Sequence, residues 1–237
     1  MTPKTASTQA LRDLAEVVSH CRRCPRLRAY CARIAEVRRR AYRDWTYWAR
    51  PVPGFGDARA RVLVVGLAPG AHGANRTGRM FTGDGAGATL IAALYRTGFA
   101  SQPTSLSRDD GLRLRDLYLT AAVRCAPPDD RPAPAEIANC QSYLAAELRL
   151  LERVQVIVAL GRVAHLAFLR AAAAVGISLS RPAPPFAHGA AARLTWGTRT
   201  LILLDTYHPS RQNTQTGRLT PAMLDRVLRR ARRFTTT

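Results

Sequence analysis

The chain has 237 residues, 36 lysines and arginines against 16 aspartates and glutamates, and a formal charge of +20 at pH 7. An apolar fraction of 47% excludes a disordered basic tail, and the length is ample for a buried core. No apolar run approaches the ~20 residues that span a bilayer, and the N-terminus lacks the apolar core of a signal peptide. We therefore expect an intracellular, cytoplasmic protein that does not enter membranes.

The surplus of positive charge indicates a polyanionic partner. All the basic residues except Lys4 are arginine. A codon bias explains arginine in place of lysine, but it does not explain the excess of bases over acids. Nucleic acid is the commonest partner of such a surface, because each phosphate contact releases a counterion. We accordingly expect a protein that binds nucleic acid.

The first third of the chain changes character at about residue 57. Helices are expected over 8–19 and over the arginine-rich stretch 25–43, each with an apolar stripe at helical spacing. Proline and glycine then predict a loop over 48–57. The continuous apolar run 61–66 follows, which is typical of a strand buried on both faces.

Strands and helices alternate over the rest of the chain. Further strands are expected over 117–123, 154–160 and 201–204. Further helices are expected over 86–97, 135–151, 161–174 and 221–234. The stretch 178–197 is less regular and is expected to hold a short extra strand or a hairpin.

This alternation predicts an α/β fold with a central four-stranded parallel sheet flanked by helices. We expect one domain over 1–237, in which residues 1–57 form an N-terminal helical extension. Ligands of such sheets bind outside the carboxyl ends of the strands. The loops expected there span 67–84, 124–134, 161–162 and 205–217, and they contain most of the unusual chemistry.

Five cysteines occur at positions 21, 24, 31, 125 and 140. Their odd number and the lack of an export signal argue against a disulfide framework. The C-x2-C at Cys21 and Cys24, with the pair Cys125 and Cys140, would supply four thiolates to zinc or to an iron–sulfur cluster, and the spacing leaves both open. Cys31 is expected not to be a ligand, because four thiolates already complete a site.

Several segments together resemble one family. Residues 66–84, GLAPGAHGANRTGRMFTGD, resemble motif A of the iron–sulfur uracil-DNA glycosylases, and residues 207–217, YHPSRQNTQTG, resemble their second catalytic motif. Residues 118–128 resemble the segment before the third cluster cysteine. The resemblance runs from about residue 20 to residue 234. It implies the uracil-DNA glycosylase-like fold and a structural 4Fe–4S cluster on Cys21, Cys24, Cys125 and Cys140.

The finer resemblance is to family 5, also called type b. The sister family 4 has a glutamate at the position of Leu67 and a uracil-reading asparagine at the position of Ala121, and both residues are apolar here. The resemblance therefore implies a DNA repair glycosylase that excises uracil and other deaminated bases, such as hypoxanthine, and leaves an abasic site. Because Ala121 cannot read the base edge, a broader substrate range is expected.

The catalytic roles implied are those of an N-glycosyl hydrolase. Asp84 is expected to orient the attacking water, and His208 to donate a hydrogen bond to the departing base. The loop at Ala68 and Gly70 would add backbone N–H donors, and Phe81 would stack on the flipped base. Two plainer interpretations compete here, since Asp84 could serve as a helix N-cap and Phe81 as ordinary core.

The DNA-facing residues are implied by the same resemblance. Arg211 and Asn213, with Gln212 between them, resemble the loop that enters the minor groove. Arg76 and Arg79 are expected near the flipped base. The resemblance also implies a monomer. The rival functions are a non-catalytic nucleic-acid-binding protein with a structural metal, and a redox iron–sulfur protein.

Overall fold

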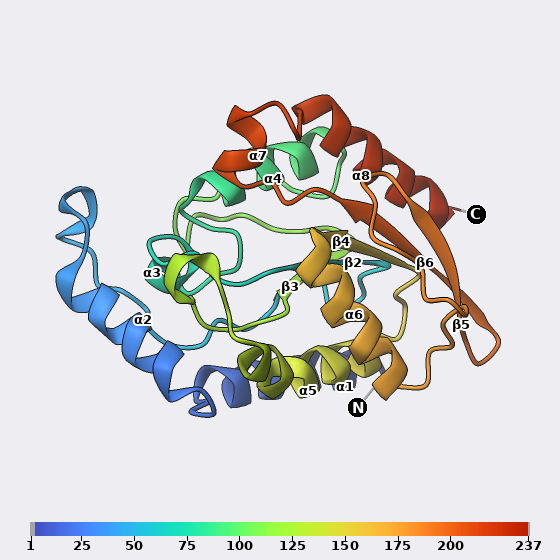
Figure 1. Ribbon diagram of the computed structural model, residues 1–237, viewed down its shortest axis with the longest axis horizontal. Helices are drawn as coiled ribbons and strands as arrows, with labels where there is room; N and C mark the ends of the chain where they lie inside the picture. Colours follow the sequence, from blue (N-terminus) through green and yellow to red (C-terminus); the bar gives the residue numbers. More distant parts are fainter. Residues whose placement is uncertain (1–2, 237) are drawn as a thin grey trace.

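Three strands that are buried along their whole length form the middle of the sheet. They are β2 (Val62–Gly66), β3 (Leu117–Ala121) and β4 (Val156–Leu160), and no residue in them is exposed. The computed structural model describes residues 3–236 and shows these strands between two layers of helices (Figure 1). The continuous apolar runs in the sequence have this cause, since both faces of each strand are covered.

The sheet has six strands in the order β1-β3-β2-β4-β6-β5. The central four are parallel, with β6 at Arg199–Thr206, and this confirms the expected parallel core. The whole sheet has two more strands than the four of the expected parallel core. Both additional strands pair antiparallel at the edges, β1 (Phe55–Gly56) with β3 and β5 (Ala191–Trp196) with β6.

The two edge strands lack the continuous apolar run that marks the buried strands in the sequence. β1 has two residues within a segment rich in proline and glycine. β5 is largely exposed, so its sequence shows no apolar run, but it lies within the stretch 178–197 and confirms the short extra strand that was one of the two structures expected there. An edge strand needs to bury little, and its pattern is correspondingly weak.

The helices cover the two faces of the sheet. In chain order they are α1 (Pro3–Ser19), α2 (Pro25–Val37), α3 (Ala74–Thr77), α4 (Gly85–Arg96), α5 (Pro134–Leu150), α6 (Arg162–Ala174), α7 (Arg211–Gln215) and α8 (Pro221–Thr236). Short 3-10 turns span Arg40–Tyr42 and Pro128–Asp130. The apolar sides of α4 and α8 pack on one face, and those of α1, α5 and α6 on the other (Figure 1). No helix in the described part of the chain is long and apolar enough to cross a membrane.

The helix expected over 25–43 ends at Val37. Arg38 adopts a left-handed backbone with φ of 49°, which stops the helix. Its guanidinium donates to the carbonyls of Ala35 and Arg43, so the turn is held by the same residue that makes it. The segment 38–48 then leaves the helix and packs against the loop that precedes α4.

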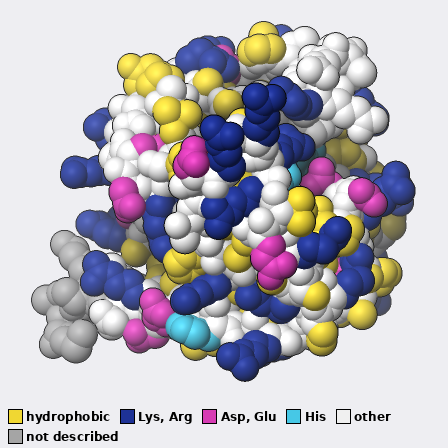
Figure 2. All heavy atoms as spheres, turned by 90° about the vertical axis from the view of Figure 1, so that its left-hand side faces the viewer, with side chains coloured by type: hydrophobic (Ala, Val, Ile, Leu, Met, Phe, Trp, Pro, Cys, Tyr) yellow, Lys and Arg dark blue, Asp and Glu magenta, His cyan; other side chains and the backbone are white. Residues whose placement is uncertain are grey.

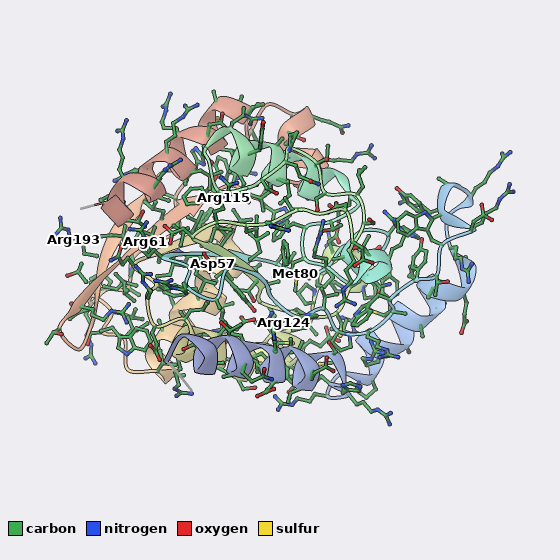
Figure 3. All side chains as sticks on the ribbon, turned by 180° about the vertical axis from the view of Figure 1, so that it is seen from behind. Asp57, Arg61, Met80, Arg115, Arg124 and Arg193 are labelled. Atoms are coloured by element: carbon green, nitrogen blue, oxygen red, sulfur yellow. The ribbon has the colours of Figure 1, made fainter. Side chains whose placement is uncertain are left out.

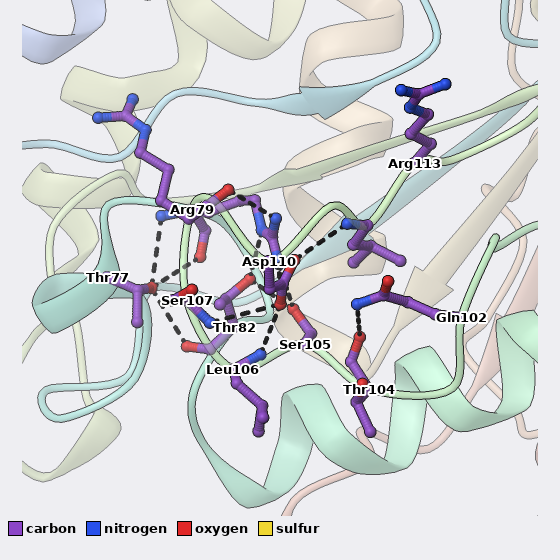
Figure 4. Close-up of polar contacts among 12 residues, drawn as sticks. Thr77, Arg79, Thr82, Gln102, Thr104, Ser105, Leu106, Ser107, Asp110 and Arg113 are labelled. Carbon is purple, nitrogen blue, oxygen red and sulfur yellow. Dashed lines mark hydrogen bonds and ion pairs between the residues drawn. The ribbon is translucent and has the colours of Figure 1, made fainter.

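Arg79 anchors that loop from inside the protein (Figure 4). Its side chain is 5% exposed and donates at 2.8 Å to both carboxylate oxygens of Asp110, and at 2.9 Å to Thr82. Burial raises the pKa of Asp110, but hydrogen bonds from the Leu112 amide and from Arg79 outweigh it and hold the pKa below its ordinary value. The expectation that Arg79 lies at the DNA-reading face near the flipped base was therefore wrong, because all its donors go to internal acceptors, which are Asp110, Thr82, Ser105 and the carbonyl of Arg108.

Replacing Arg79 by methionine should destabilise the fold strongly. Removal of one partner leaves the Asp110 carboxylate poorly compensated, and breaking such a pair costs about 3–5 kcal/mol. The free energy of unfolding in urea measures the loss. The control is Arg113→Met, an exposed arginine of the neighbouring segment, which should change the stability by less than ~0.5 kcal/mol. Equal losses in the two variants would contradict the anchoring role.

Candidate active site

Loops from the carboxyl ends of the parallel strands meet on one side of the molecule. This is the side that carries α3, which follows β2, and α7, which follows β6. Arginine side chains gather over this side, with only scattered acidic residues between them (Figure 2). The surface around the carboxyl ends of the parallel strands, where the site is expected, is therefore strongly basic.

The side chain of Asp84 is closely packed at the start of α4, in a position that we call its seat: the Gly87 amide on one side, and Gly70 and Gly73 on the other. Its backbone is extended, and its Oδ1 accepts a 2.8 Å hydrogen bond from the amide of Gly87, which makes it the N-cap of the helix. Its Oδ2 lies against Gly70 and Gly73, so closely that a Cβ on either glycine would overlap the carboxylate. The two interpretations of Asp84 are therefore compatible, because the cap bond uses one oxygen and holds the other in place.

Burial raises the pKa of Asp84 above its ordinary value. Hydrogen bonding from the Gly87 amide lowers it in part, while the nearby carboxylate of Asp130 raises it further. Asp130 follows β3 and has a left-handed backbone with φ of 54°. The sequence analysis did not select Asp130, because its only local signal is an aspartate pair in a proline-rich loop.

His208 lies at the wall of a cavity of about 260 Å³. Burial lowers its pKa to about 4, so the imidazole is neutral at physiological pH. The side-chain amide of Asn213 donates a 2.8 Å hydrogen bond to the carbonyl of His208, and Gly161 leaves room beside its Cβ. The cavity is also lined by Leu67, Leu160, Arg162, Val163, Phe186, Tyr207 and Arg218.

Phe186 and Arg218 are site residues that the sequence analysis missed. Phe186 comes from the irregular segment before β5, and its ring contacts that of Tyr207 at 6.3 Å between centroids. Arg218 lies 4.6 Å above the same tyrosine ring. Neither residue belongs to a motif, so only the folded chain brings them to the cavity.

The remaining candidates are divided between two places. Ala121 ends β3, and the ring of Phe81, from the loop before α4, packs against Gly66, the last residue of β2 and the register partner of Ala121. Phe81 has a left-handed backbone and is only 9% exposed. Arg211 is exposed on α7 and its stem approaches Gly85, next to Asp84. The cavity beside His208 includes Asn213 and, within the described chain, none of Asp84, Phe81 or Ala121.

The cysteines converge on a third, separate core. Cys24, Cys31, Cys125 and Cys140 are buried together in one cluster, with Cys21 and Ala68 packed against it. Within residues 3–236, no three ligating side chains are arranged as a metal-binding group. Burial raises the pKa of Cys140 to about 11.

The surroundings of these thiols suit a negatively charged centre. Nη1 of Arg28, which lies near Cys125, is buried and has no hydrogen-bond partner among the described residues. Arg124 lies in the interior of the molecule (Figure 3). Its Nε and Nη1 likewise have no partner among the described residues, although its Nη2 donates to Glu147. Orphaned guanidinium donors beside four thiols fit a site that holds a thiolate-bound metal or cluster.

Asp84 variants should separate its two structural contributions. The pKa of Asp84 is higher in the folded than in the unfolded protein, so the ionised carboxylate lowers the stability of the fold at neutral pH. This destabilisation decreases as the pH falls and is absent below the pKa of Asp84 in the unfolded chain. Asp84→Asn keeps the cap acceptor without the charge, so it should be more stable than the wild type at pH 7, with a gap that narrows on acidification. Asp84→Ala also loses the cap and should be about 1 kcal/mol less stable than Asp84→Asn. Thermal unfolding across pH measures both differences, and a pH-independent gap would contradict the raised pKa.

Comparison with known proteins agrees with this geometry. The profile of the "Uracil DNA glycosylase superfamily" matches residues 53–232. The chain is 52% identical to a type-5 uracil-DNA glycosylase of Thermus thermophilus, over 92% of this chain and 95% of the relative. It is 51% identical to the type-5 enzyme of Mycobacterium leprae, over 94% of each. A type-4 enzyme of Thermotoga maritima is 34% identical over 67% of this chain and 69% of its own. The chain therefore belongs to the uracil-DNA glycosylase superfamily and, within it, to the type-5 enzymes.

Proposed function

We propose that this protein is a DNA repair glycosylase that flips uracil out of DNA and hydrolyses its N-glycosidic bond, leaving an abasic site. The observation that carries the proposal is a seated carboxylate, Asp84, and a neutral buried imidazole, His208, at the same edge of the sheet in a member of this superfamily. Both side chains stand in the motifs that resemble the family's catalytic segments.

The chemistry needs opposite electrostatics on the two sides of the breaking bond. Positive charge develops on the sugar, and negative charge on the departing base. The Asp84 carboxylate favours the cationic sugar and orients the water that attacks it. Its raised pKa makes it a stronger base than an exposed aspartate, because burial disfavours the ionised form.

The imidazole of His208 serves the other side. A neutral ring has one N–H, which can donate to a base carbonyl as charge accumulates on its oxygen. The Asn213 bond to the backbone of His208 supports the loop that presents the ring. Because burial keeps the ring neutral, the donor is present throughout the physiological pH range.

The proposal extends to other deaminated bases, such as hypoxanthine. Ala121 presents no hydrogen-bonding side chain to the base edge, so it cannot discriminate between edges by their donors and acceptors. Stacking on Phe81 contributes about 1–3 kcal/mol and tolerates any base. The backbone at Ala68 and Gly70 would supply the remaining donors.

DNA binding is assigned to the arginine-rich side around the site. Arg211 is exposed on α7 and adjacent to the N-terminus of α4, which suits a residue that enters the minor groove. Phosphate contacts by the surrounding arginines make binding strongly salt-dependent. A monomer suffices for this arrangement, because all the assigned residues come from one chain.

A 4Fe–4S cluster is proposed on Cys21, Cys24, Cys125 and Cys140. When bound, it would supply iron–thiolate bonds that cross-link the start of α2, the loop after β3 and α5. Burial with the orphaned donors of Arg28 and Arg124 supports an anionic centre here. The assigned role is structural, since glycosidic hydrolysis exchanges no electrons.

The function is tested by base release from matched duplexes that contain uracil, hypoxanthine, xanthine or ethenocytosine. Uracil release with a remaining abasic site is expected, together with release of at least one purine. His208→Ala should slow the single-turnover rate about 10²–10³-fold, as the loss of one anion-stabilising donor does. Tight DNA binding without release of any of these bases would reject the enzyme and favour a non-catalytic binding protein.

The cluster is tested by iron and sulfide analysis of protein purified without oxygen. Cys140→Ser should lose the bound iron and lower the melting temperature. Cys31→Ser is the matched control, because Cys31 is buried in the same core but is expected not to be a ligand. Bound zinc, or equal iron loss in both variants, would contradict the assignment.

A further inference from the structure

Arg76 is a buried arginine whose guanidinium bonds two backbone carbonyls of the loop that leads to Asp84. The residue is 4% exposed. Its Nε donates at 2.8 Å to the carbonyl of His72, and its Nη2 donates at 2.9 Å to the carbonyl of Gly83. The expectation that Arg76 faces DNA was wrong, since these donors point into the protein.

The two carbonyls bracket the seat of the Asp84 carboxylate. His72 stands between Gly70 and Gly73, the two residues against which the carboxylate rests, and Gly83 directly precedes Asp84. The guanidinium of Arg76 therefore links the backbone at His72, next to Gly73, with the backbone at Gly83, next to Asp84. Gly83 has no room for a side chain, because a Cβ there would meet Nη2 of Arg76.

Two aromatic rings hold Arg76 in place. The guanidinium carbon lies 4.0 Å from the ring centroid of Tyr42 and 4.0 Å from that of Trp45. Trp45 is 36% exposed, and its contact with Arg76 explains why so large an apolar side chain stays at the surface. A desolvated cation–π contact is worth up to about 2 kcal/mol, so the rings add appreciably to the grip on Arg76.

The segment that carries these rings is itself bonded to the loop. The amide of Trp48 donates at 2.9 Å to the carbonyl of Arg76, and Tyr47 is hydrogen-bonded to Nδ1 of His72 at 2.9 Å. Asn75 donates at 3.4 Å to the carbonyl of Cys31 in α2. The N-terminal extension thus reaches the loop of Asp84 through both its helix and its aromatic segment.

We propose that Arg76 is a positioning residue for Asp84, and that the aromatic segment 38–48 supports the active site by holding Arg76. This inference rests on the proposed function for its catalytic consequence. Lysine could not replace the arginine fully, because an ammonium lacks the planar fork that reaches two carbonyls and stacks between two rings.

The test compares Arg76→Met, Arg76→Lys and Trp45→Ala. Arg76→Met should lower the single-turnover rate of uracil excision about 10–100-fold with DNA affinity nearly unchanged, because small misplacements of a catalytic group cost rate and not binding. Arg76→Lys should fall between the wild type and Arg76→Met. Trp45→Ala keeps Arg76 and should cost about 3–10-fold, which also covers the case in which Arg76→Met does not fold.

A second measurement, amide hydrogen exchange, reports on the position of the Asp84 carboxylate and needs no catalytic turnover. The Gly87 amide donates to the Asp84 carboxylate, so its hydrogen exchange reports whether that carboxylate stays in place. Exchange should quicken about tenfold in Arg76→Met and less in Trp45→Ala. If the wild type releases no uracil, the proposed function fails while this exchange still decides the inference.

Arg199→Met is the matched control. Arg199 also lies over a tryptophan, Trp196 at 5.4 Å, and also donates to a backbone carbonyl, but it is the first residue of β6 and lies at the end of the sheet opposite the site loops. It should leave both the rate and the Gly87 exchange at wild-type values. The inference is overturned if Arg76→Met excises uracil at the wild-type rate with unchanged Gly87 exchange, or if its defect is entirely in DNA affinity.

Discussion

The partial burial of one carboxylate is the constraint on which the rest of the site depends. An ionised group removed from water needs compensation, and Asp84 receives it from the amide end of α4. The loop before the helix must then pass close to the charge, and only glycine at positions 70 and 73 permits that approach. Arg76 and Arg79 both hold this loop from inside the protein, so two internal arginines support the position of the Asp84 carboxylate.

The positive charge of the chain serves two separate purposes. Arg79, Arg124 and Arg61 are paired with Asp110, Glu147 and Asp116 inside or at the margin of the fold. Such pairs contribute little net stability compared with apolar residues, but they fix geometry because each fork accepts only one arrangement. The exposed arginines, by contrast, create the field that attracts DNA. The net charge alone therefore does not distinguish the buried, paired arginines from the exposed ones, and the burial of each side chain does.

The sequence was most informative where one physical cause dominates. Double-sided burial makes β2, β3 and β4 continuous apolar runs, so the parallel core was predictable. The edge strands β1 and β5 bury little and left no comparable trace. Motif residues located Asp84 and His208, but motifs do not say whether an arginine points inward, and Arg76 and Arg79 were consequently misplaced. No sequence pattern predicted that Phe186 lines the cavity, because its position depends on tertiary packing alone.

Burial shifts the pKa values of the two proposed catalytic groups in opposite directions, which suits the complementary roles proposed for them. It raises the pKa of Asp84 and lowers that of His208 to about 4, since each environment penalises the charged form. In the proposed mechanism, the carboxylate of Asp84 favours the cationic sugar in the transition state. The imidazole dipole remains available for the base, so one physical effect separates the two roles.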